Sequence, residues 1–188
     1  MRWRRAEHAA MRRSPAWIVV LALLAATAGL LVGRWYKPGR GGGEGYSQVG
    51  AARAAFVRPD VEGKPRDIGE WNGQLVVLNF WASWCAPCRT EMPVLDRIAQ
   101  RHAGRGLAVI GIAVDAAAAT REFLREHPVG YPILVDDPQT DGNLSTIYGN
   151  ERKVLPYTVL IGRDGRILAQ HFGLFDESAL SAWLQPHL

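Results

Sequence analysis

Apolar residues occur along the chain in short runs, separated by turn residues or by segments with helical spacing. Residues 74–81 and 107–114 are nearly continuous apolar runs, which is typical of strands buried on both faces of a sheet. Further strands are predicted at residues 133–135, 157–161 and 166–172, after a short hairpin at 56–68. Helices are predicted at residues 87–102, 116–127, 144–148 and 176–185, the last capped by Asp176. This order predicts an α/β fold in which a central mixed sheet is flanked by helices.

A different apolar pattern precedes this domain. Residues 16–33 carry no charge, and as a helix they would span about 27 Å at ~1.5 Å per residue, nearly the hydrocarbon thickness of a bilayer. Trp17 lies at the start of this segment, and Trp35 and Tyr36 follow it, where aromatic rings favour the two interfaces. Five arginines precede the segment and three basic residues follow it, which favours a cytoplasmic N-terminus. We therefore predict a single transmembrane anchor and an exported domain.

A cleaved signal peptide is the competing interpretation, because Ala26-Thr27-Ala28 fits the small-residue cleavage pattern. The apolar run continues past that point, so an uncleaved anchor is favoured. The predicted organisation is a basic cytoplasmic segment (1–15), the anchor (16–33), a flexible linker rich in Pro and Gly (34–50) and one domain (51–188). This organisation predicts a single-pass protein of the bacterial inner membrane, with its domain in the periplasm or on the outer face.

Charge is divided unevenly between these parts. Of the 22 Lys and Arg residues, eight fall within residues 1–40 together with a single acid. The remaining chain carries fourteen basic and seventeen acidic residues, so the domain itself is slightly acidic. The basic character therefore belongs to the membrane flanks, and no nucleic-acid partner is expected.

The chain's two cysteines, Cys85 and Cys88, lie just after the apolar run 74–81 and at the start of a predicted helix. The partial positive charge of a helix N-terminus favours a thiolate, and the second sulfur is close enough to attack a mixed disulfide at the first. A structural disulfide would close only a tiny loop and would contribute little stability. A zinc site needs four ligands, but the five histidines are scattered singly. The pattern therefore favours a dithiol redox catalyst with no metal and no further cofactor.

Residues 79–93 (NFWASWCAPCRTEMP) resemble the thioredoxin-like family and, more narrowly, the membrane-tethered TlpA/ResA-type disulfide reductases of bacteria. Residues 155–165 (LPYTVLIGRDG) are similar to the segment in which that family carries a cis-proline followed by a hairpin. The resemblance covers roughly residues 51–188. It implies a thioredoxin-like fold with an N-terminal β-hairpin, preceded here by the single transmembrane helix.

The resemblance also implies roles for individual residues. Cys85 would be the attacking thiolate and Cys88 the more buried, resolving thiol. Pro156 would be the cis-proline, although a trans proline at a strand start is the plain alternative. Its cis bond would let the Leu155 backbone face the disulfide and pair with an extended substrate segment. Trp84 would shield the sulfurs and contact the substrate.

Glu91 follows Cys88 by one helical turn. ResA-type proteins carry a functional glutamate at the matching position, whereas thioredoxin uses a buried aspartate in the preceding strand, where this chain has Asn79. Glu91 is thus the candidate base for Cys88, acting directly or through water. The alternative is a solvated acid on the helix surface near Arg89 or Arg97.

Together these features predict a membrane-anchored thiol:disulfide oxidoreductase that reduces exported proteins and is itself re-reduced by a membrane electron donor. Ala86-Pro87 supplies no cation to stabilise the thiolate further, which favours a reductant over a strong oxidant. The resemblance implies apocytochrome c or copper-assembly proteins as partners, and nothing in the sequence chooses between them. A thiol peroxidase would need its cysteine in a Pro/Thr-rich turn, which this chain lacks. A non-enzymatic domain that binds haem or copper through its cysteines is the other alternative.

Overall fold

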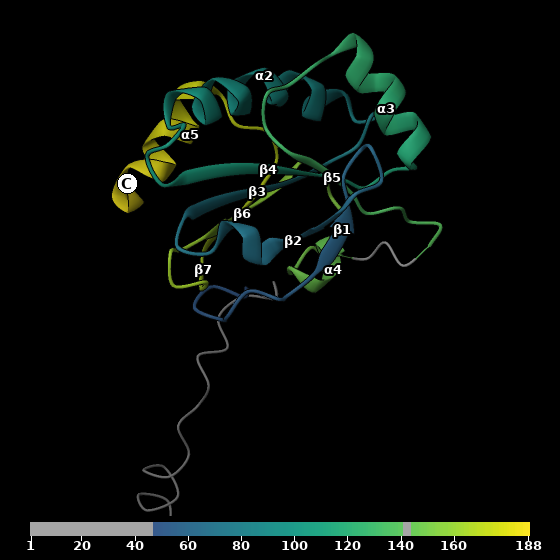
Figure 1. Ribbon diagram of the computed structural model, residues 1–188. Helices are drawn as coiled ribbons and strands as arrows, with labels where there is room; N and C mark the ends of the chain where they lie inside the picture. Colours follow the sequence, from purple (N-terminus) through teal and green to yellow (C-terminus); the bar gives the residue numbers. More distant parts are fainter. Residues whose placement is uncertain (1–46, 141–143) are drawn as a thin grey trace, which may run out of the picture. The chain divides into compact units, whose positions relative to one another are not determined.

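The central sheet has five strands in the order β5-β4-β3-β6-β7 (Figure 1). Strands β3, β4 and β5 run parallel to one another, β6 is antiparallel to β3, and β7 is antiparallel to β6. The strands comprise Leu75–Trp81 (β3), Leu107–Ala113 (β4), Ile133–Val135 (β5), Tyr157–Ile161 (β6) and Ile167–Phe172 (β7). All seven residues of β3 are buried, because this strand lies in the middle of the sheet and is covered on both faces.

This computed structural model describes residues 47–140 and 144–188. The predicted N-terminal segment 1–15, the anchor 16–33 and residues 34–46 of the predicted linker lie outside the described residues. Across the part of the chain that is described, no helix has both the length and the apolar character needed to cross a bilayer.

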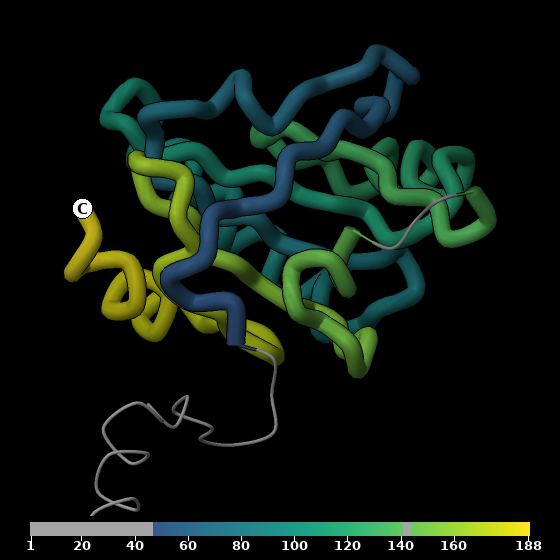
Figure 2. Tube along the Cα trace, turned by 90° about the horizontal axis from the view of Figure 1, so that it is seen from below, coloured from purple at the N-terminus to yellow at the C-terminus, as the bar shows by residue number. Residues whose placement is uncertain are grey.

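Helices cover the two faces of the sheet unequally (Figure 1). Helices α2 (Ala86–Arg101), α3 (Ala117–Glu126) and α5 (Glu177–Leu184) lie on one face. The opposite face is covered by the short helix α4 (Leu144–Ile147), the 3-10 turn Ile68–Trp71 and the segment that leads into strand β1, which crosses this face in Figure 2. A last 3-10 turn, Gln185–His187, follows α5.

Two apolar clusters form the core, one on each face of the sheet. The cluster beneath α2, α3 and α5 contains both cysteines together with Trp81, Leu95 and Phe123. The other cluster joins Phe80 and Tyr157 of the sheet to aromatic residues of the covering segments. Because β3 contributes alternate side chains to both clusters, the loop that follows it is anchored from both sides.

Most of the predicted elements are confirmed, with boundaries that shift by one or two residues. The predicted hairpin is present as β1 (Val57–Pro59) and β2 (Pro65–Asp67), which pair antiparallel around the turn at Gly63. Asp176 caps α5, accepting the Ala179 N–H at 2.8 Å. The 3-10 turn after β2 was not predicted. It begins at Asp67, whose carboxylate accepts the Gly69 N–H, in a capping box completed by Glu70.

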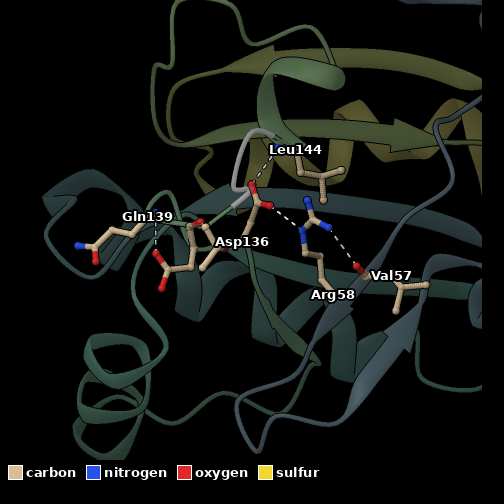
Figure 3. A network of polar contacts seen from close by, with 7 residues as sticks. Val57, Arg58, Asp136, Gln139 and Leu144 are labelled. Carbon is tan, nitrogen blue, oxygen red and sulfur yellow. Dashed lines mark hydrogen bonds and ion pairs between the residues drawn. The ribbon is translucent and has the colours of Figure 1, made fainter.

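A buried ion pair joins the hairpin to the end of the sheet (Figure 3). Asp136 directly follows β5, and its side chain is fully buried. One carboxylate oxygen accepts the Arg58 Nε–H at 2.7 Å, and the other accepts the Leu144 N–H at 2.9 Å (Figure 3). A single carboxylate therefore links β1, the end of β5 and the first residue of α4.

Replacing Asp136 with asparagine should destabilise the domain strongly. Arg58 is only 14% exposed, and removing one partner of a buried pair costs on the order of 3 kcal/mol, because the remaining charge is left uncompensated. Urea denaturation followed by tryptophan fluorescence measures this loss. The matched control is Glu70→Gln, which removes the charge of the exposed pair with Arg66 and should cost far less, because solvent screens such pairs. Equal losses in the two variants would contradict the prediction.

Candidate active site at the Cys85–Cys88 pair

The two cysteines lie where the loop after β3 turns into α2. Cys85 is the N-cap of the helix, and its sulfur accepts the Cys88 N–H at 3.3 Å. The two sulfurs are joined in a disulfide, with Cys85 5% exposed and Cys88 fully buried. A thiolate at Cys85 would keep the favourable field of the helix N-terminus. The arrangement thus offers one reachable sulfur and one protected sulfur.

The loop before Cys85 is held by a carboxylate that follows the neighbouring strand β4. Asp115, two residues after the end of β4, accepts both the backbone N–H and the hydroxyl of Ser83, at 3.1 and 2.5 Å. Trp84 is left 68% exposed between this anchored serine and the disulfide. Asp115 fixes the path of the loop while the indole beside the sulfurs stays open to solvent. The sequence analysis did not single out Asp115.

The segment before β6 lies at the same end of the sheet. Its Leu155–Pro156 peptide bond is cis, as the resemblance implied. The Pro156 carbonyl accepts the Gly173 N–H at 2.9 Å, whereas Leu155 makes no backbone hydrogen bond to any described residue. The Leu155 side chain packs against the cluster that contains both cysteines. The backbone of Leu155 therefore has hydrogen-bonding capacity left for a bound chain.

A buried asparagine fixes the loop that precedes this segment. The Asn150 side chain donates to the Val154 carbonyl at 2.8 Å and accepts the Val154 N–H at 3.0 Å. These two bonds close the loop that carries Glu151, Arg152 and Lys153. Sequence reasoning missed Asn150, although its place five residues before a predicted cis bond was a usable signal.

Exposed apolar side chains gather at the same end of the sheet. Trp84 precedes the disulfide and Val154 precedes the cis peptide bond. Phe172 is the last residue of β7 and pairs with Tyr157 at the start of β6, and Leu174 follows two residues later. Large apolar side chains with this much exposed area often mark a surface that binds another protein. Of these side chains, Trp84 directly precedes Cys85 in the chain, whereas the Phe172 ring packs on Tyr157 with ring centroids 4.6 Å apart.

Glu91 is buried, not solvated. Only 1% of its surface is exposed, so the interpretation as a helix-surface acid near Arg89 or Arg97 is wrong. One carboxylate oxygen accepts the Asn79 side-chain amide at 2.9 Å, and the other accepts the Phe175 N–H at 2.7 Å. The acid thus joins α2 to β3 and to the loop between β7 and α5.

Desolvation governs the charge of this acid. Burial raises the pKa of Glu91 from 4.5 to about 7, while the hydrogen bonds from Phe175 and Asn79 favour the charged form and lower it. A carboxyl group with a pKa near neutrality can exchange a proton at ordinary pH. The structure therefore gives Glu91 the burial and the proton affinity that a base for a buried thiol requires.

Close packing surrounds this acid. Tyr131 is buried, which raises the pKa of its phenol, and the charge of Glu91 raises that pKa further. Gly111 leaves room for two large side chains, since a Cβ there would lie 3.1 Å from Trp81 Nε1 and 3.2 Å from the Tyr131 ring. Neither Trp81 Nε1 nor the Tyr131 hydroxyl has a hydrogen-bond partner among the described residues. Within those residues, no three His, Cys, Asp or Glu side chains are grouped as metal ligands.

Comparisons with known proteins agree with this geometry. Residues 49–170 match the AhpC/TSA family. The thiol-disulfide oxidoreductase ResA of Bacillus thuringiensis strain Al Hakam is 30% identical over 139 residues, covering 73% of this chain and 78% of that protein. Among solved structures, a putative thiol:disulfide interchange protein DsbE from Chlorobium tepidum is 28% identical with a TM-score of 0.65, covering 73% of this chain and 94% of that one. The exposed lipoprotein thioredoxin Etrx1 of Streptococcus pneumoniae strain TIGR4 is 27% identical with a TM-score of 0.62, covering 71% and 99%.

The raised pKa of Glu91 makes a specific prediction for stability. The usual pKa of a glutamate is 4.5, whereas the pKa of Glu91 in the folded protein is about 7. Between these two pH values, the folded oxidised protein keeps a proton that the unfolded chain has released. The free energy of unfolding should therefore fall as pH rises through this window, by on the order of 2 kcal/mol. Glu91→Gln should remove this slope, because its side chain does not titrate. Urea denaturation of both oxidised proteins at several pH values tests this, and equal slopes would contradict it.

Proposed function

Because this chain belongs to the AhpC/TSA family, we propose that it is a membrane-anchored reductase of disulfide bonds in exported proteins. The chain is a thiol-disulfide oxidoreductase of the ResA/DsbE type, with Cys85 and Cys88 as its CxxC pair. Its substrates are thus proteins with disulfides or thiols. The anchor, the reductive direction and the roles of individual residues are the further content of the proposal.

In the proposed reaction, the Cys85 thiolate attacks a substrate disulfide. The substrate S–S bond breaks, a mixed disulfide forms at Cys85, and one substrate sulfur leaves as a thiolate that takes up a proton. Cys88 then loses its proton and attacks the Cys85 sulfur of the mixed disulfide. The second substrate sulfur leaves, and the Cys85–Cys88 disulfide forms. Two electrons pass from the protein dithiol to the substrate.

The observation that carries the assignment of the cysteine roles is their unequal burial at the start of α2. Cys85 caps the helix and keeps some exposure, whereas Cys88 is fully buried. An incoming disulfide can approach only a sulfur that is reachable, and the helix N-terminus stabilises the thiolate there. The buried partner can attack only within the protein, which is the task of a resolving thiol.

Substrate binding is proposed at the end of the sheet that carries the disulfide. The free hydrogen-bonding groups of Leu155 support pairing with an extended substrate segment beside Pro156. Exposed Trp84 supports a contact with the residues that flank the substrate cysteine. Exposed Leu174 is proposed to extend this surface, since it follows Gly173, whose N–H binds the Pro156 carbonyl.

Glu91 is proposed as the proton acceptor for Cys88. Its place one turn along the same helix, its burial and its pKa of about 7 support this role. A thiol in apolar surroundings has little tendency to ionise unaided. A base whose proton affinity matches ambient pH lowers that barrier in the resolving step, either directly or through one water molecule.

Export and re-reduction complete the proposal. The uncharged segment 16–33 and its basic flanks support a single anchor in the bacterial inner membrane, with the domain in the periplasm or on the outer face. The similarity to a pneumococcal lipoprotein whose name describes it as exposed supports the same side. Such a compartment is oxidising, so a reductase there needs a membrane electron donor. Apocytochrome c and copper-assembly proteins are the proposed substrates.

Substitution of the two cysteines should separate the steps. Cys85→Ser should abolish exchange, because the remaining thiol, Cys88, is fully buried and a substrate disulfide cannot reach it. Cys88→Ser should still attack and should then accumulate the mixed disulfide, which mass spectrometry under non-reducing conditions detects. The double variant is the control for non-specific adducts. Exchange activity in Cys85→Ser, or a trapped adduct on Cys88 instead of Cys85, would overturn the assigned roles.

The reduction potential tests the proposed direction. We expect the full chain in detergent, equilibrated against glutathione or dithiothreitol buffers, to titrate near or below roughly −200 mV, towards the thioredoxin side of the scale. The redox state can be read by alkylation of free thiols. A value near about −120 mV would instead indicate a disulfide donor and would contradict the reductive direction.

A further inference from the structure

We propose that Thr158 is a positioning residue for the exchange reaction, because its hydroxyl orients the Asn79 amide that holds the Glu91 carboxylate. The proposal rests on the proposed function, in which Glu91 accepts the proton of Cys88. It assigns a role to a buried polar pair in the sheet that neither the sequence motifs nor the disulfide accounts for.

The pair is built into the sheet. Asn79 of β3 and Thr158 of β6 are direct partners in the antiparallel register, and their side chains meet beneath α2. Asn79 is 1% exposed and Thr158 is fully buried. Apolar residues fill the neighbouring positions of both strands. A buried polar pair in such a place is costly unless each group is satisfied.

The side-chain amide nitrogen of Asn79 donates both hydrogen bonds of this arrangement. It lies 2.9 Å from Glu91 Oε2 and 3.0 Å from Thr158 Oγ1. An amide NH₂ group has two hydrogens, so one can be directed to each acceptor. If the amide turned over, its oxygen would face the carboxylate oxygen. The hydroxyl of Thr158 accepts the second hydrogen and so keeps the first aimed at Glu91.

This arrangement surrounds the carboxylate with donors. Asn79 donates to Oε2 and the Phe175 N–H donates to Oε1 at 2.7 Å. Both bonds favour the charged acid, in opposition to burial. Without the Thr158 hydroxyl, one buried N–H of Asn79 would lose its acceptor. An amide that is no longer held at its second hydrogen would direct its first hydrogen to Glu91 less constantly, so the bond that favours the charged acid would weaken. Loss of the hydroxyl should therefore favour the neutral acid.

Other titratable groups near Glu91 come from several elements. Cys88 lies one turn earlier on α2, and the Tyr131 phenol approaches from the segment before β5. His171 of β7 stacks on Phe175 with ring centroids 3.8 Å apart, and burial lowers its pKa. None of these groups contacts the Thr158 hydroxyl through a hydrogen bond in the described residues. A change at Thr158 therefore acts on Glu91 through Asn79.

The test follows the resolving step against pH. The full chain in detergent is reduced and mixed with glutathione disulfide, and quenched samples are analysed by mass spectrometry between pH 5 and 9. The decay of the glutathione adduct on Cys85 gives the rate of attack by Cys88. In the wild-type protein this rate should fall at low pH as Glu91 becomes protonated. This fall is the acidic limb of the pH profile, called the limb below, and Glu91→Gln should remove it.

Thr158→Val keeps the shape of the side chain and removes the hydroxyl. We expect it to shift the limb to higher pH by about one unit, because the proton affinity of Glu91 should rise roughly tenfold. Thr158→Ser restores the hydroxyl and should return the limb to the wild-type position. In the Glu91→Gln background, Thr158→Val should move nothing. Thr120→Val is the matched control, since Thr120 is also a fully buried threonine, whose hydroxyl donates to the Ala116 carbonyl at the start of α3, and it should leave the limb in place.

Infrared titration of the oxidised protein gives a readout that does not depend on exchange. The carboxyl stretch that disappears in Glu91→Gln should persist to higher pH in Thr158→Val. If Thr158→Val fails to fold, Thr158→Ala takes its place in both measurements. A limb that Glu91→Gln removes but Thr158→Val leaves unmoved would overturn the role of Thr158 and keep that of Glu91. A limb that survives in Glu91→Gln would overturn both.

Discussion

The sulfur of Cys85 is the cap of α2 and also the proposed attacking atom of the site, and the surrounding elements hold it in place for both roles. The sulfur can cap the helix only because β3 ends four residues earlier, fixed by buried partners on both sides. The loop between them is held by the Asp115 carboxylate, which binds Ser83, and by a bond from the Cys85 N–H to the Ala82 carbonyl. The helix N-terminus then favours the thiolate form of the same sulfur. One junction thus sets the position and the exposure of the proposed attacking group, and it favours the thiolate form of that group.

The buried Glu91 shows what this arrangement costs. A carboxyl group with a pKa raised to about 7 by burial disfavours the folded state at neutral and higher pH. The two donors on its oxygens offset part of that penalty. A fully apolar side chain at this position would avoid the penalty, but it could not exchange a proton with Cys88. The stability that is given up here is consistent with the proposed role of Glu91 as a base of near-neutral proton affinity for the buried Cys88 thiol.

The contrast between what the sequence predicted and what it missed has a physical basis. The strands around Trp81 and Ile112 were predictable because a continuous apolar run reports burial directly. The cis bond before Pro156 was implied by the family resemblance and is present. Asp136, Asn150 and Thr158 were missed because each is one polar residue in an ordinary context, and its importance arises from partners distant in the chain or from complete burial. The burial of Glu91 was likewise hidden, since helical spacing placed it beside arginines but could not show that the β7–α5 loop covers it.

That loop also joins two halves of the site that the sequence keeps apart. Gly173 donates to the carbonyl of Pro156, and two residues later Phe175 donates to Glu91. Leu174, between them, is exposed beside the reactive end of the sheet. The segment that would contact a substrate is therefore tied through three consecutive residues to the acid that is proposed to serve the resolving thiol. A hydrogen bond from Phe175 to a charged carboxylate is stronger than one to a neutral acid. Protonation of Glu91 should therefore weaken the bond that holds this loop.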